Sequence, residues 1–512
     1  MVEDIEKGKR LAKNTIVLYL RMLFLMVIGL YTSRVFLQAL GVEDFGIYNV
    51  VGGFVGLFAI ISKSLSGAAS RFLNFEMGRG DKDKLKVVFS STVTIQIFLA
   101  IFVALLAESV GVWFVNTQLV IPSERIYAAN WCFQLSVITF CSTLVTVPYN
   151  AAIIAHEKMT TFAYVSIFEG LTKLCIAFLI MVAPFDRLIF YALLLCILQL
   201  VIQYIYRYYC KKQFEECTYK YIYDKFFLRQ LLSYAGWGYI GSTSVILRNQ
   251  GINILINLFF GPVVNAARAV ANQVLHAVDG FVQNFITAVR PQITQSYAAE
   301  NYDYLNKLLM ISSKFSYYLF LLLSLPILLN TDYILNLWLT EVPEHSILFV
   351  QLTLLFTMIN TLVHPLSIAQ AATGKIRDYQ LATGGLQLLN LPISWVCLKL
   401  GCPAESVLIV AIVIIISVVF VSVFMLKRLI PFDTKTYMQK VILNVVLVTF
   451  VSYVICNCLR YCMPGSFLYL IVHIGLCVLI TGVSIFYLGC NKKERFYVVE
   501  KVDKFRKKFF RT

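Results

Sequence analysis

Long apolar runs follow one another along almost the whole chain, with short polar connections between them. Each run can cross about 30 Å of hydrocarbon as a helix that rises about 1.5 Å per residue. Because lipid satisfies no backbone hydrogen bonds, such runs predict α-helices. About 14 spans are predicted, at residues 14–40, 45–69, 87–115, 124–150, 160–183, 186–209, 230–259, 264–288, 305–330, 345–372, 378–400, 404–426, 437–459 and 466–489.

The Lys and Arg residues test this topology, because cytoplasmic connections of membrane proteins carry an excess of positive charge. With a cytoplasmic N-terminus, most of the 44 basic residues fall in inside connections, and the outside connections hold Arg125, Arg187, Lys399 and Arg460. One span more or fewer would reverse every later connection and destroy this separation. We therefore predict an all-α polytopic membrane protein with both termini in the cytoplasm.

A weak internal repeat indicates how the spans are grouped. The span that opens near residue 41 and closes at Arg71 resembles, at an offset of about 220 residues, the one that opens at Gly261 and closes at Arg290. Equal orientation of the copies is typical of transporters built from two parallel lobes. Two six-helix lobes, residues 1–209 and 230–428, are predicted around a central cavity, and a basic cytoplasmic linker at residues 210–229 joins them. An additional helix pair at residues 429–490 and a basic cytoplasmic tail at residues 491–512 follow.

Composition excludes several classes of protein. Hydrophobic residues make up 59% of the 512 positions and charged residues 14%, whereas a soluble chain has about 25% charged residues. The net charge of +16 does not predict nucleic-acid binding, because the cations are spread over short connections. The cysteines lie mostly in apolar runs, as small hydrophobic residues do, and no acid or histidine completes a metal-ligand pattern beside Cys456, Cys458 and Cys462. Neither a metal nor a cofactor is predicted.

Cations inside the spans are the first candidate site. A charged side chain in lipid costs kilocalories unless it faces protein or water, so it suggests a function. By position within their spans, Arg21 and Lys63 lie toward the cytoplasm, Arg248 lies near mid-depth, and Arg34 and Arg268 lie toward the outside. We predict that these five form a path for an anionic group. The alternative for Arg21, Arg34 and Arg268 is that their long side chains reach the interfaces.

Other polar residues in the spans have narrower interpretations. Glu169 and Lys173 are four residues apart on one helix face, which predicts a structural ion pair. His276 and Asp279 are three apart and are candidates for ion coupling, with pairing of Asp279 to Arg248 as the alternative. Arg71 is interpreted as a topology residue at the cytoplasmic end of its span.

Motifs for enzymatic chemistry are missing. The sequence has no Walker-type phosphate loop, no Ser-x-x-Lys or Gly-x-Ser-x-Gly nucleophile and no His-Glu-x-x-His. The predicted outside connections are short, whereas a membrane glycosyltransferase would need more structure outside the membrane. Transport is therefore favoured over catalysis.

The first eighty residues resemble a known family. The first predicted span closes on Ser33-Arg34-Val35-Phe36-Leu37, the turn Leu40-Gly41-Val42-Glu43-Asp44-Phe45-Gly46-Ile47-Tyr48 follows, and the second span closes on Ser70-Arg71. This pattern is similar to the start of bacterial polysaccharide and O-antigen repeat-unit flippases, within the multidrug, oligosaccharidyl-lipid and polysaccharide flippase superfamily.

The resemblance implies a function. Its members enclose a cavity that opens alternately to either side of the bacterial inner membrane. Their substrate is a short glycan on undecaprenyl diphosphate, which they move to the periplasmic leaflet for O-antigen, capsule or exopolysaccharide assembly. The implied partners are this lipid-linked oligosaccharide, membrane lipids and a polysaccharide polymerase.

The charges within the spans agree with an anionic substrate. A diphosphate is best bound by Arg and Lys in a low-dielectric cleft, and cations outnumber the acids Glu108, Glu169 and Asp279 at membrane depth. A drug extruder that handles cations should show an acid-rich cavity instead. The alternatives are a multidrug or cation antiporter of the same superfamily, a peptidoglycan-precursor flippase and, third, a membrane glycosyltransferase.

Overall fold

The computed structural model describes residues 2–56, 59–117, 121–184, 186–221, 224–339, 342–461, 467–492 and 494–496. Within these ranges the chain is helical and contains no β-strand. The prediction of an all-α polytopic membrane protein is confirmed. Long apolar helices explain this outcome, because they satisfy their backbone hydrogen bonds internally and need no partner strand.

The first seven helices precede residue 214. They are α1 (Val2–Gly56), α2 (Ala59–Arg79), α3 (Lys82–Leu106), α4 (Val112–Thr117), α5 (Ile126–Ala155), α6 (Met159–Met181) and α7 (Arg187–Gln213). A π-helical turn, Ala107–Gly111, joins α3 to α4, and the short 3-10 helix η3 (Glu215–Cys217) follows α7. The turn predicted at Leu40–Gly46 lies within the assigned bounds of α1.

The later helices begin with the 74-residue α8 (Lys225–Ala298), which contains two predicted spans. Gly261 separates them, with φ 79° and ψ −172°, a conformation that glycine adopts without a steric penalty. The others are α9 (Tyr302–Leu329), α10 (Thr331–Trp338), α11 (Ser346–Asn360), α12 (Val363–Ala372), α13 (Arg377–Leu388), α14 (Asn390–Lys399), α15 (Ser406–Leu429), α16 (Thr434–Tyr437), α17 (Leu443–Tyr461) and α18 (Phe467–Ser484).

Within the described chain, 11 helical segments are long and apolar enough to cross a membrane. This number is roughly consistent with the predicted total of about 14. The remaining predicted spans, 45–69, 230–259 and 264–288, lie in α1, α2 and α8. These three spans hold Lys63, Arg248 and Arg268, which are three of the five cations predicted to form the anion path.

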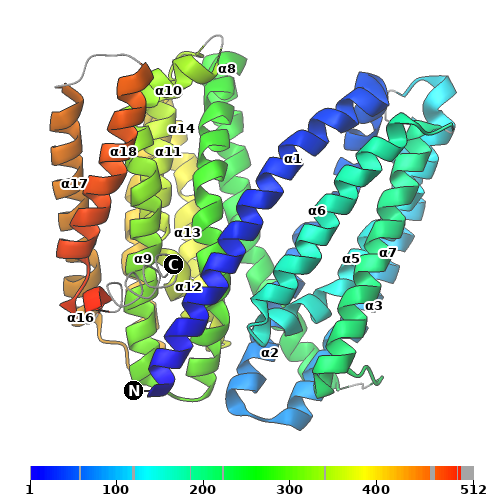
Figure 1. The fold of residues 1–512 in the computed structure, drawn as a ribbon, viewed down its shortest axis with the longest axis horizontal. Coiled ribbons are helices and arrows are strands. Elements are labelled where there is room, and N and C mark those ends of the chain that lie inside the picture. Colours follow the sequence, from blue (N-terminus) through cyan, green and yellow to red (C-terminus); the bar gives the residue numbers. More distant parts are fainter. Residues whose placement is uncertain are drawn as a thin grey trace, which may run out of the picture. The chain divides into compact units, whose positions relative to one another are not determined.

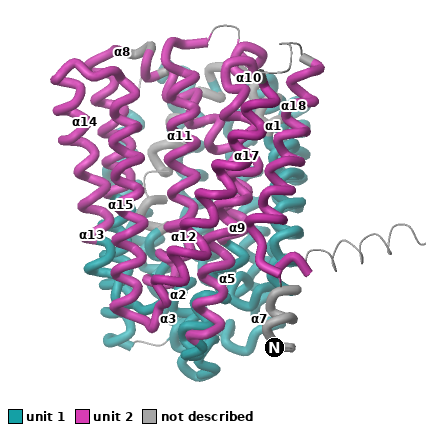
Figure 2. Tube along the Cα trace, turned by 90° about the vertical axis from the view of Figure 1, so that its left-hand side faces the viewer, with its two compact units in different colours: residues 1–243, 287–301, 371–380 teal, residues 244–286, 302–370, 381–512 magenta. Residues whose placement is uncertain are grey.

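The chain forms two compact units (Figure 2). Unit 1 comprises residues 1–243, 287–301 and 371–380, and unit 2 comprises residues 244–286, 302–370 and 381–512. The predicted division into two lobes, a linker, a helix pair and a tail stays a prediction.

In unit 1, α5 packs against α7, α3, α2 and α1, and α1 lies along α6 (Figure 1). Aromatic pairs fill the core, such as Phe89 with Tyr149, whose ring centroids are 5.3 Å apart. Ion pairs fix the helix ends: Arg125 Nε lies 2.8 Å from Asp44, and Arg125 Nη1 lies 2.6 Å from Asp186. The Asp186 carboxylate also caps the N-terminus of α7.

Residues 287–301, an outlying segment of unit 1, make specific contacts with the helices of this unit. Gln295 Nε2 donates to the carbonyl of Ala155 at 2.8 Å. Gly78 of α2 lies so close to α8 that an added Cβ would be 2.5 Å from Gln295 O. The approach therefore requires a residue without a side chain at position 78.

In unit 2, α11 packs against α15, and α9 packs against α17 and α18. Polar contacts attach the α17–α18 pair to α9. Lys314 Nζ lies 2.7 Å from Glu494, and Asn330 lies 3.0 Å from His473 Nδ1. The carbonyl of Cys456 lies 3.1 Å from His473 Nε2, so both nitrogens of this buried imidazole have partners.

Candidate anion-binding site

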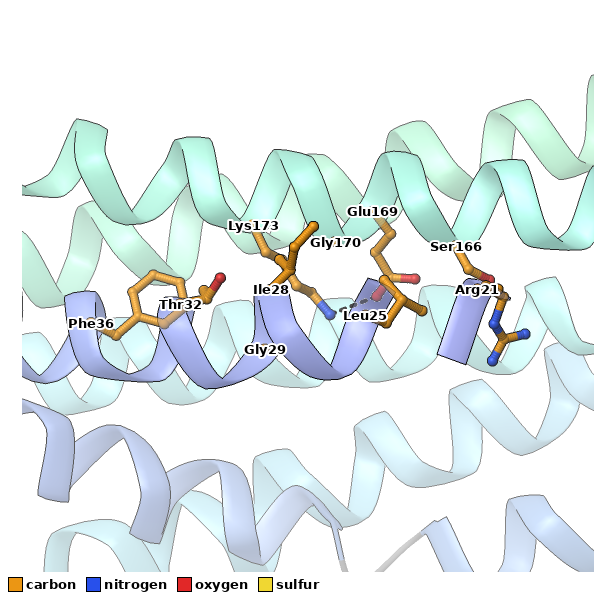
Figure 3. A pocket seen from close by; sticks show the side chains of 10 residues that line it. All are labelled: Arg21, Leu25, Ile28, Gly29, Thr32, Phe36, Ser166, Glu169, Gly170 and Lys173. Atoms are coloured by element: carbon orange, nitrogen blue, oxygen red, sulfur yellow. Dashed lines mark hydrogen bonds and ion pairs between the residues drawn. The ribbon is translucent and has the colours of Figure 1, made fainter. Parts of the chain in front are cut away.

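A cavity of about 410 Å³ lies between α1 and α6 within unit 1 (Figure 3). Its lining side chains come from these two helices. They are Arg21, Leu25, Ile28, Gly29, Thr32 and Phe36 of α1, and Ser166, Glu169, Gly170 and Lys173 of α6.

Helical periodicity explains why these residues share a cavity. Arg21, Leu25, Ile28 and Thr32 recur at intervals of three or four residues, so they form one stripe along α1. From Arg21 to Phe36 this stripe is about 22 Å long. Gly170 lets α1 come near, because a Cβ at that position would lie 2.6 Å from Leu25 Cδ2.

Arg21 supplies the unsatisfied charge of the cavity. Its Nε and Nη1 are buried and have no hydrogen-bond partner in the described structure. The guanidinium carbon lies 4.5 Å from the centroid of the Phe162 ring, which provides a cation–π contact but accepts no conventional hydrogen bond. A buried, unsatisfied donor costs about 1–3 kcal/mol, and more when it is charged. An anion in the cavity would remove this cost.

Glu169 is the one acid among the described lining residues, and its partner is already present. Lys173 Nζ lies 2.6 Å from Glu169 Oε1, and a dashed line in Figure 3 marks this pair. Arg21 and Lys173 give two positive charges and Glu169 gives one negative charge. The cavity therefore keeps a net charge of +1, and Thr32 Oγ1, which is also buried without a partner, adds a hydroxyl.

Arg248 occupies a buried position in unit 2, on the first part of α8. It is 8% exposed. Its Nη1 donates to Gln387 Oε1 at 3.2 Å, and its Nη2 donates to Asn249 Oδ1 at 3.0 Å. The guanidinium lies 4.9 Å from the centre of the Phe356 ring. These partners are neutral, so they leave its charge uncompensated.

Arg268 lies after the Gly261 break and is 6% exposed. Its Nη2 donates to the backbone oxygen of Asn249 at 3.3 Å, whereas its Nη1 is buried without a partner. Arg248 and Arg268 thus meet at Asn249, and no carboxylate pairs with either of them among the described contacts. We call these two side chains the Asn249 arginine pair.

The other predicted residues are not brought into either site. The side chains of Arg34 and Lys63 lie outside the described part of the structure. His276 is exposed, and Asp279 Oδ2 accepts from Gln283 at 3.1 Å. No hydrogen bond or ion pair in the described part of α8 joins His276 to Asp279 or Asp279 to Arg248.

Arg71 has a role that the sequence interpretation missed. Its Nη2 donates to the carbonyl of Ala372 at 2.7 Å, and its guanidinium lies 4.5 Å from the Phe75 ring centroid. A cation that binds the last carbonyl of a helix also interacts favourably with the helix dipole. Arg71 therefore binds the last carbonyl of α12, whose final two residues belong to unit 1. No sequence signal indicates this contact, because 301 positions separate the two residues.

Among the described residues, no three His, Cys, Asp or Glu side chains are grouped as metal ligands. The arrangement offers buried guanidinium groups without carboxylate partners, as an anionic ligand requires, at Arg21 in unit 1 and at the Asn249 arginine pair in unit 2.

Solved structures with a similar fold are membrane transporters. An outward-facing multidrug resistance MATE family transporter of the MOP superfamily has a TM-score of 0.71 at 11% identity, covering 82% of this chain and 95% of that one. A MOP superfamily transporter from Pyrococcus furiosus has a TM-score of 0.67 at 12% identity, covering 83% and 96%. A mutant of the Vibrio cholerae MATE transporter VcmN has a TM-score of 0.68 at 17% identity, covering 84% and 98%. Identities this low show a shared fold.

Sequence comparison gives the family. No curated protein sequence matches the chain. The family model described as "Polysaccharide biosynthesis protein" matches residues 11–297, which is more than half of the chain and includes both Arg21 and the Asn249 arginine pair. The resemblance noted in the first eighty residues is confirmed, and the chain belongs to the polysaccharide biosynthesis protein family.

Proposed function

We propose that this membrane protein is a flippase that moves oligosaccharide repeat units, linked to undecaprenyl diphosphate, from the cytoplasmic to the periplasmic leaflet. The product would serve O-antigen, capsule or exopolysaccharide assembly. The family concerns polysaccharide biosynthesis and the fold is that of transporters, so both support a transporter in a polysaccharide pathway.

The unpartnered guanidinium of Arg21 carries this proposal. A folded chain retains a buried cation with free donors only if something offsets its cost, and a substrate anion is the simplest partner. A diphosphate offers oxygen acceptors that match the planar fork of Arg. In this proposal Arg21 binds the phosphate groups, and the hydroxyls of Thr32 and Ser166 contact the attached sugar.

The Asn249 arginine pair supports the same substrate class. Two buried arginines with neutral partners form a second place where a dianion would be stabilised. The proposal also includes Lys63 and Arg34, on sequence grounds, as further steps of the anionic path. Alternating access would pass the head group along this path while the lipid tail stays in the bilayer.

A multidrug or cation antiporter is the main alternative. Some proteins with this fold are named multidrug resistance transporters, and the Pyrococcus furiosus relative is described as having a binding pocket of reverse polarity that suggests a different function. Pocket polarity is therefore the useful criterion. The net positive charge of the α1–α6 cavity favours an anion, whereas ion coupling through Asp279 and His276 would favour the antiporter.

The proposal places the protein in a bacterial inner membrane, with both termini cytoplasmic and a polysaccharide polymerase as a partner. A peptidoglycan-precursor flippase would bind the same diphosphate. The two are distinguished by the consequence of deletion: loss of a surface polymer supports the proposal, and loss of growth supports the precursor flippase. A glycosyltransferase would form product in a purified system.

Substitution of Arg21 tests the proposal. In a strain that lacks the chromosomal copy, surface polysaccharide is measured with wild type, Arg21→Ala, Arg21→Lys and the control Lys211→Ala, an exposed cation at the end of α7. In Arg21→Ala, the loss of charge-assisted hydrogen bonds worth about 1.5–3 kcal/mol should lower the affinity for the diphosphate about 10-fold to 150-fold.

We expect Arg21→Ala to lose surface polysaccharide at unchanged protein level and to accumulate lipid-linked units in the cytoplasmic leaflet. Arg21→Lys should keep part of the activity and Lys211→Ala all of it. Full polysaccharide in Arg21→Ala would refute the assignment. If wild type instead restores resistance to cationic dyes in this strain and has no effect on surface polysaccharide, the antiporter is favoured.

A further inference from the structure

A second cavity of unit 1, of about 370 Å³, lies among connections that the charge pattern assigns to the cytoplasm. It is bounded by the α2–α3 turn, the α5–α6 turn and the segment after α7. Its lining includes Glu76, Asp81, Lys82, His156, Glu215 and Glu216. The anion path described above uses none of them.

Glu76 is the unusual member of this cavity. It lies on α2, beyond the predicted span 45–69, and is 9% exposed. Its Oε2 is buried and has no hydrogen-bond partner in the described structure. A buried ionised carboxylate without a donor is costly, and it commonly avoids that cost by taking up a proton.

The other acids of the cavity already have partners. Glu216 Oε1 lies 2.5 Å from His156 Nε2. Asp81 accepts from the backbone of Lys84 at 3.0 Å and lies 3.1 Å from its ammonium group. Glu215, whose side chain is 74% exposed, lies 3.5 Å from Lys82. Glu76 is therefore the one lining carboxylate for which no donor or cation contact is described.

Charged groups face Glu76 from every element around it. On α2 these are Arg71 and Arg79, and the others are Asp81, Lys82, Lys84, Lys86, His156, Glu215 and Glu216. Burial raises the pKa of the Glu76 carboxyl, and Asp81 raises it further, whereas Arg79, Lys84 and Arg71 lower it; burial prevails. The balance favours the neutral acid more than in an exposed glutamate.

A proton fits this site better than a metal ion. Hard cations such as Ca²⁺ need six or more oxygen ligands, and the described residues contain no group of three potential side-chain ligands. A proton needs one carboxyl oxygen and a route to water, which the cavity provides. Because a bound proton removes the negative charge, it also removes the desolvation cost.

We propose that Glu76 is a proton-binding site open to the cytoplasm, and that proton uptake there stabilises the packing of α2 at this end of unit 1. Glu76 lies between Asn74 and Gly78, which both contact Gln295 of α8. The charge on Glu76 thus changes the free energy of a turn of α2 that holds the end of α8.

The sign of the effect follows from linkage. A carboxyl whose pKa is higher in the folded than in the unfolded state destabilises the fold while it is ionised. That penalty disappears as the pH falls through the folded pKa. Wild type should therefore gain stability on mild acidification, and a neutral Glu76→Gln variant should lack this gain.

The test compares full-length wild type, Glu76→Gln and the control Glu215→Gln in detergent, with unfolding temperature measured between about pH 8 and pH 5. At pH 8 we expect Glu76→Gln to unfold at a higher temperature than wild type, and the difference should vanish toward pH 5. Glu215→Gln should follow wild type. Groups common to all three proteins cancel in these differences.

Infrared difference spectra give a second measurement that does not depend on the unfolding temperature. On acidification, the carbonyl band of a protonated carboxylic acid should appear at a higher pH than expected for exposed glutamates, and Glu76→Gln should lack it. The proposal is overturned if wild type shows no such early band, or if Glu76→Gln is no more stable than wild type at pH 8.

Discussion

Replacing Arg268 with Met should give a protein that is more stable and inactive. In wild type Arg268 is 6% exposed, its Nη1 has no described partner, and its Nη2 makes a hydrogen bond of 3.3 Å to the backbone of Asn249. The group therefore loses its hydration and regains little. A Met side chain occupies similar space, carries no charge and adapts to irregular gaps.

The size of the effect can be estimated from these contacts. An unsatisfied buried donor costs about 1–3 kcal/mol, and replacing buried charges with apolar side chains stabilises proteins by about 1–4 kcal/mol in favourable cases. After subtraction of the lost hydrogen bond, we expect a net gain of about 1–2 kcal/mol. For units of this size the unfolding temperature should rise by about 2–8 °C.

The assay uses cysteines that are already present. Cys456 and Cys477 are fully buried in unit 2, so once exposed thiols such as Cys175 and Cys458 are blocked, a dye that fluoresces on reaction with thiols reports unfolding of the purified protein. Inorganic diphosphate is then added as a probe of the anion site. At a concentration 100-fold above its Kd for the Asn249 arginine pair it should stabilise wild type by about 2.7 kcal/mol through that pair, and it should stabilise Arg268→Met less, because only the Arg21 site remains.

Lys399→Met is the matched control, because Lys399 is an exposed cation of unit 2 that lies over the Trp395 ring. Its stability should change by less than about 0.5 kcal/mol, and its response to diphosphate should be unchanged. A lower unfolding temperature for Arg268→Met would show that Arg268 is structural. Equal stabilisation of wild type and Arg268→Met by diphosphate would place the anion elsewhere.

Three further predictions concern unit 1. Arg71→Ala removes the cap of α12 and should lower stability by about 1–3 kcal/mol, with partial rescue by Lys, in the same thiol assay. Gly78→Ala places a Cβ 2.5 Å from a backbone oxygen and should lower the free energy of unfolding by about 1–3 kcal/mol. Gly67→Ala, whose Cβ would have nothing within 4 Å, should raise it by up to about 1 kcal/mol. If Gly78→Ala proved more stable than Gly67→Ala, the observed packing would be contradicted. Burial opposes ionisation of Asp186, but hydrogen bonds from the start of α7 and from Arg125 outweigh it and lower the pKa of Asp186. The stability that Asp186 adds should therefore be present above its ordinary pKa of 3.8 and disappear as the pH falls through its lower folded pKa. The difference in unfolding temperature between wild type and Asp186→Asn should thus narrow only in strong acid.

The sequence was sufficient for the fold because lipid imposes a simple rule on it. Contiguous apolar runs must form helices, and the Lys and Arg between them indicate the side of each connection. Gly261 also followed from the pattern, since it lies between two predicted spans and has a positive φ in the structure. The resemblance in the first eighty residues correctly indicated the family.

Pairing between helices could not be predicted in the same way. Glu169 and Lys173 share a helix face, which their spacing predicts, but nothing in one sequence shows that this face meets Arg21 of α1. Register between packed helices depends on side-chain fit and on small residues such as Gly170. The contact between Arg71 and Ala372 was missed for the same reason.

Depth within a span was also an incomplete guide. Counting residues along straight helices put Arg248 near mid-depth and Arg268 toward the outside, yet both side chains reach Asn249. The break at Gly261 and the length of the Arg side chain bring them together. A count of 1.5 Å per residue describes Cα positions, whereas binding depends on where the guanidinium groups lie.

The described cations fall into two sets, and the contrast between them is the strongest argument for a substrate anion. The first set has carboxylate partners. Near helix ends these pairs are Arg10 with Glu157, Arg125 with Asp44 and Asp186, and Arg460 with Asp332, and within predicted spans Lys173 pairs with Glu169 and Lys314 with Glu494. Arg21, Arg248 and Arg268 lie within predicted spans, where an unpaired charge costs most, yet no described carboxylate pairs with them. If these three served only packing, carboxylate partners or apolar replacements would be more stable. A transported anion explains why the costly positions stay unpaired, because a permanent carboxylate there would compete with it.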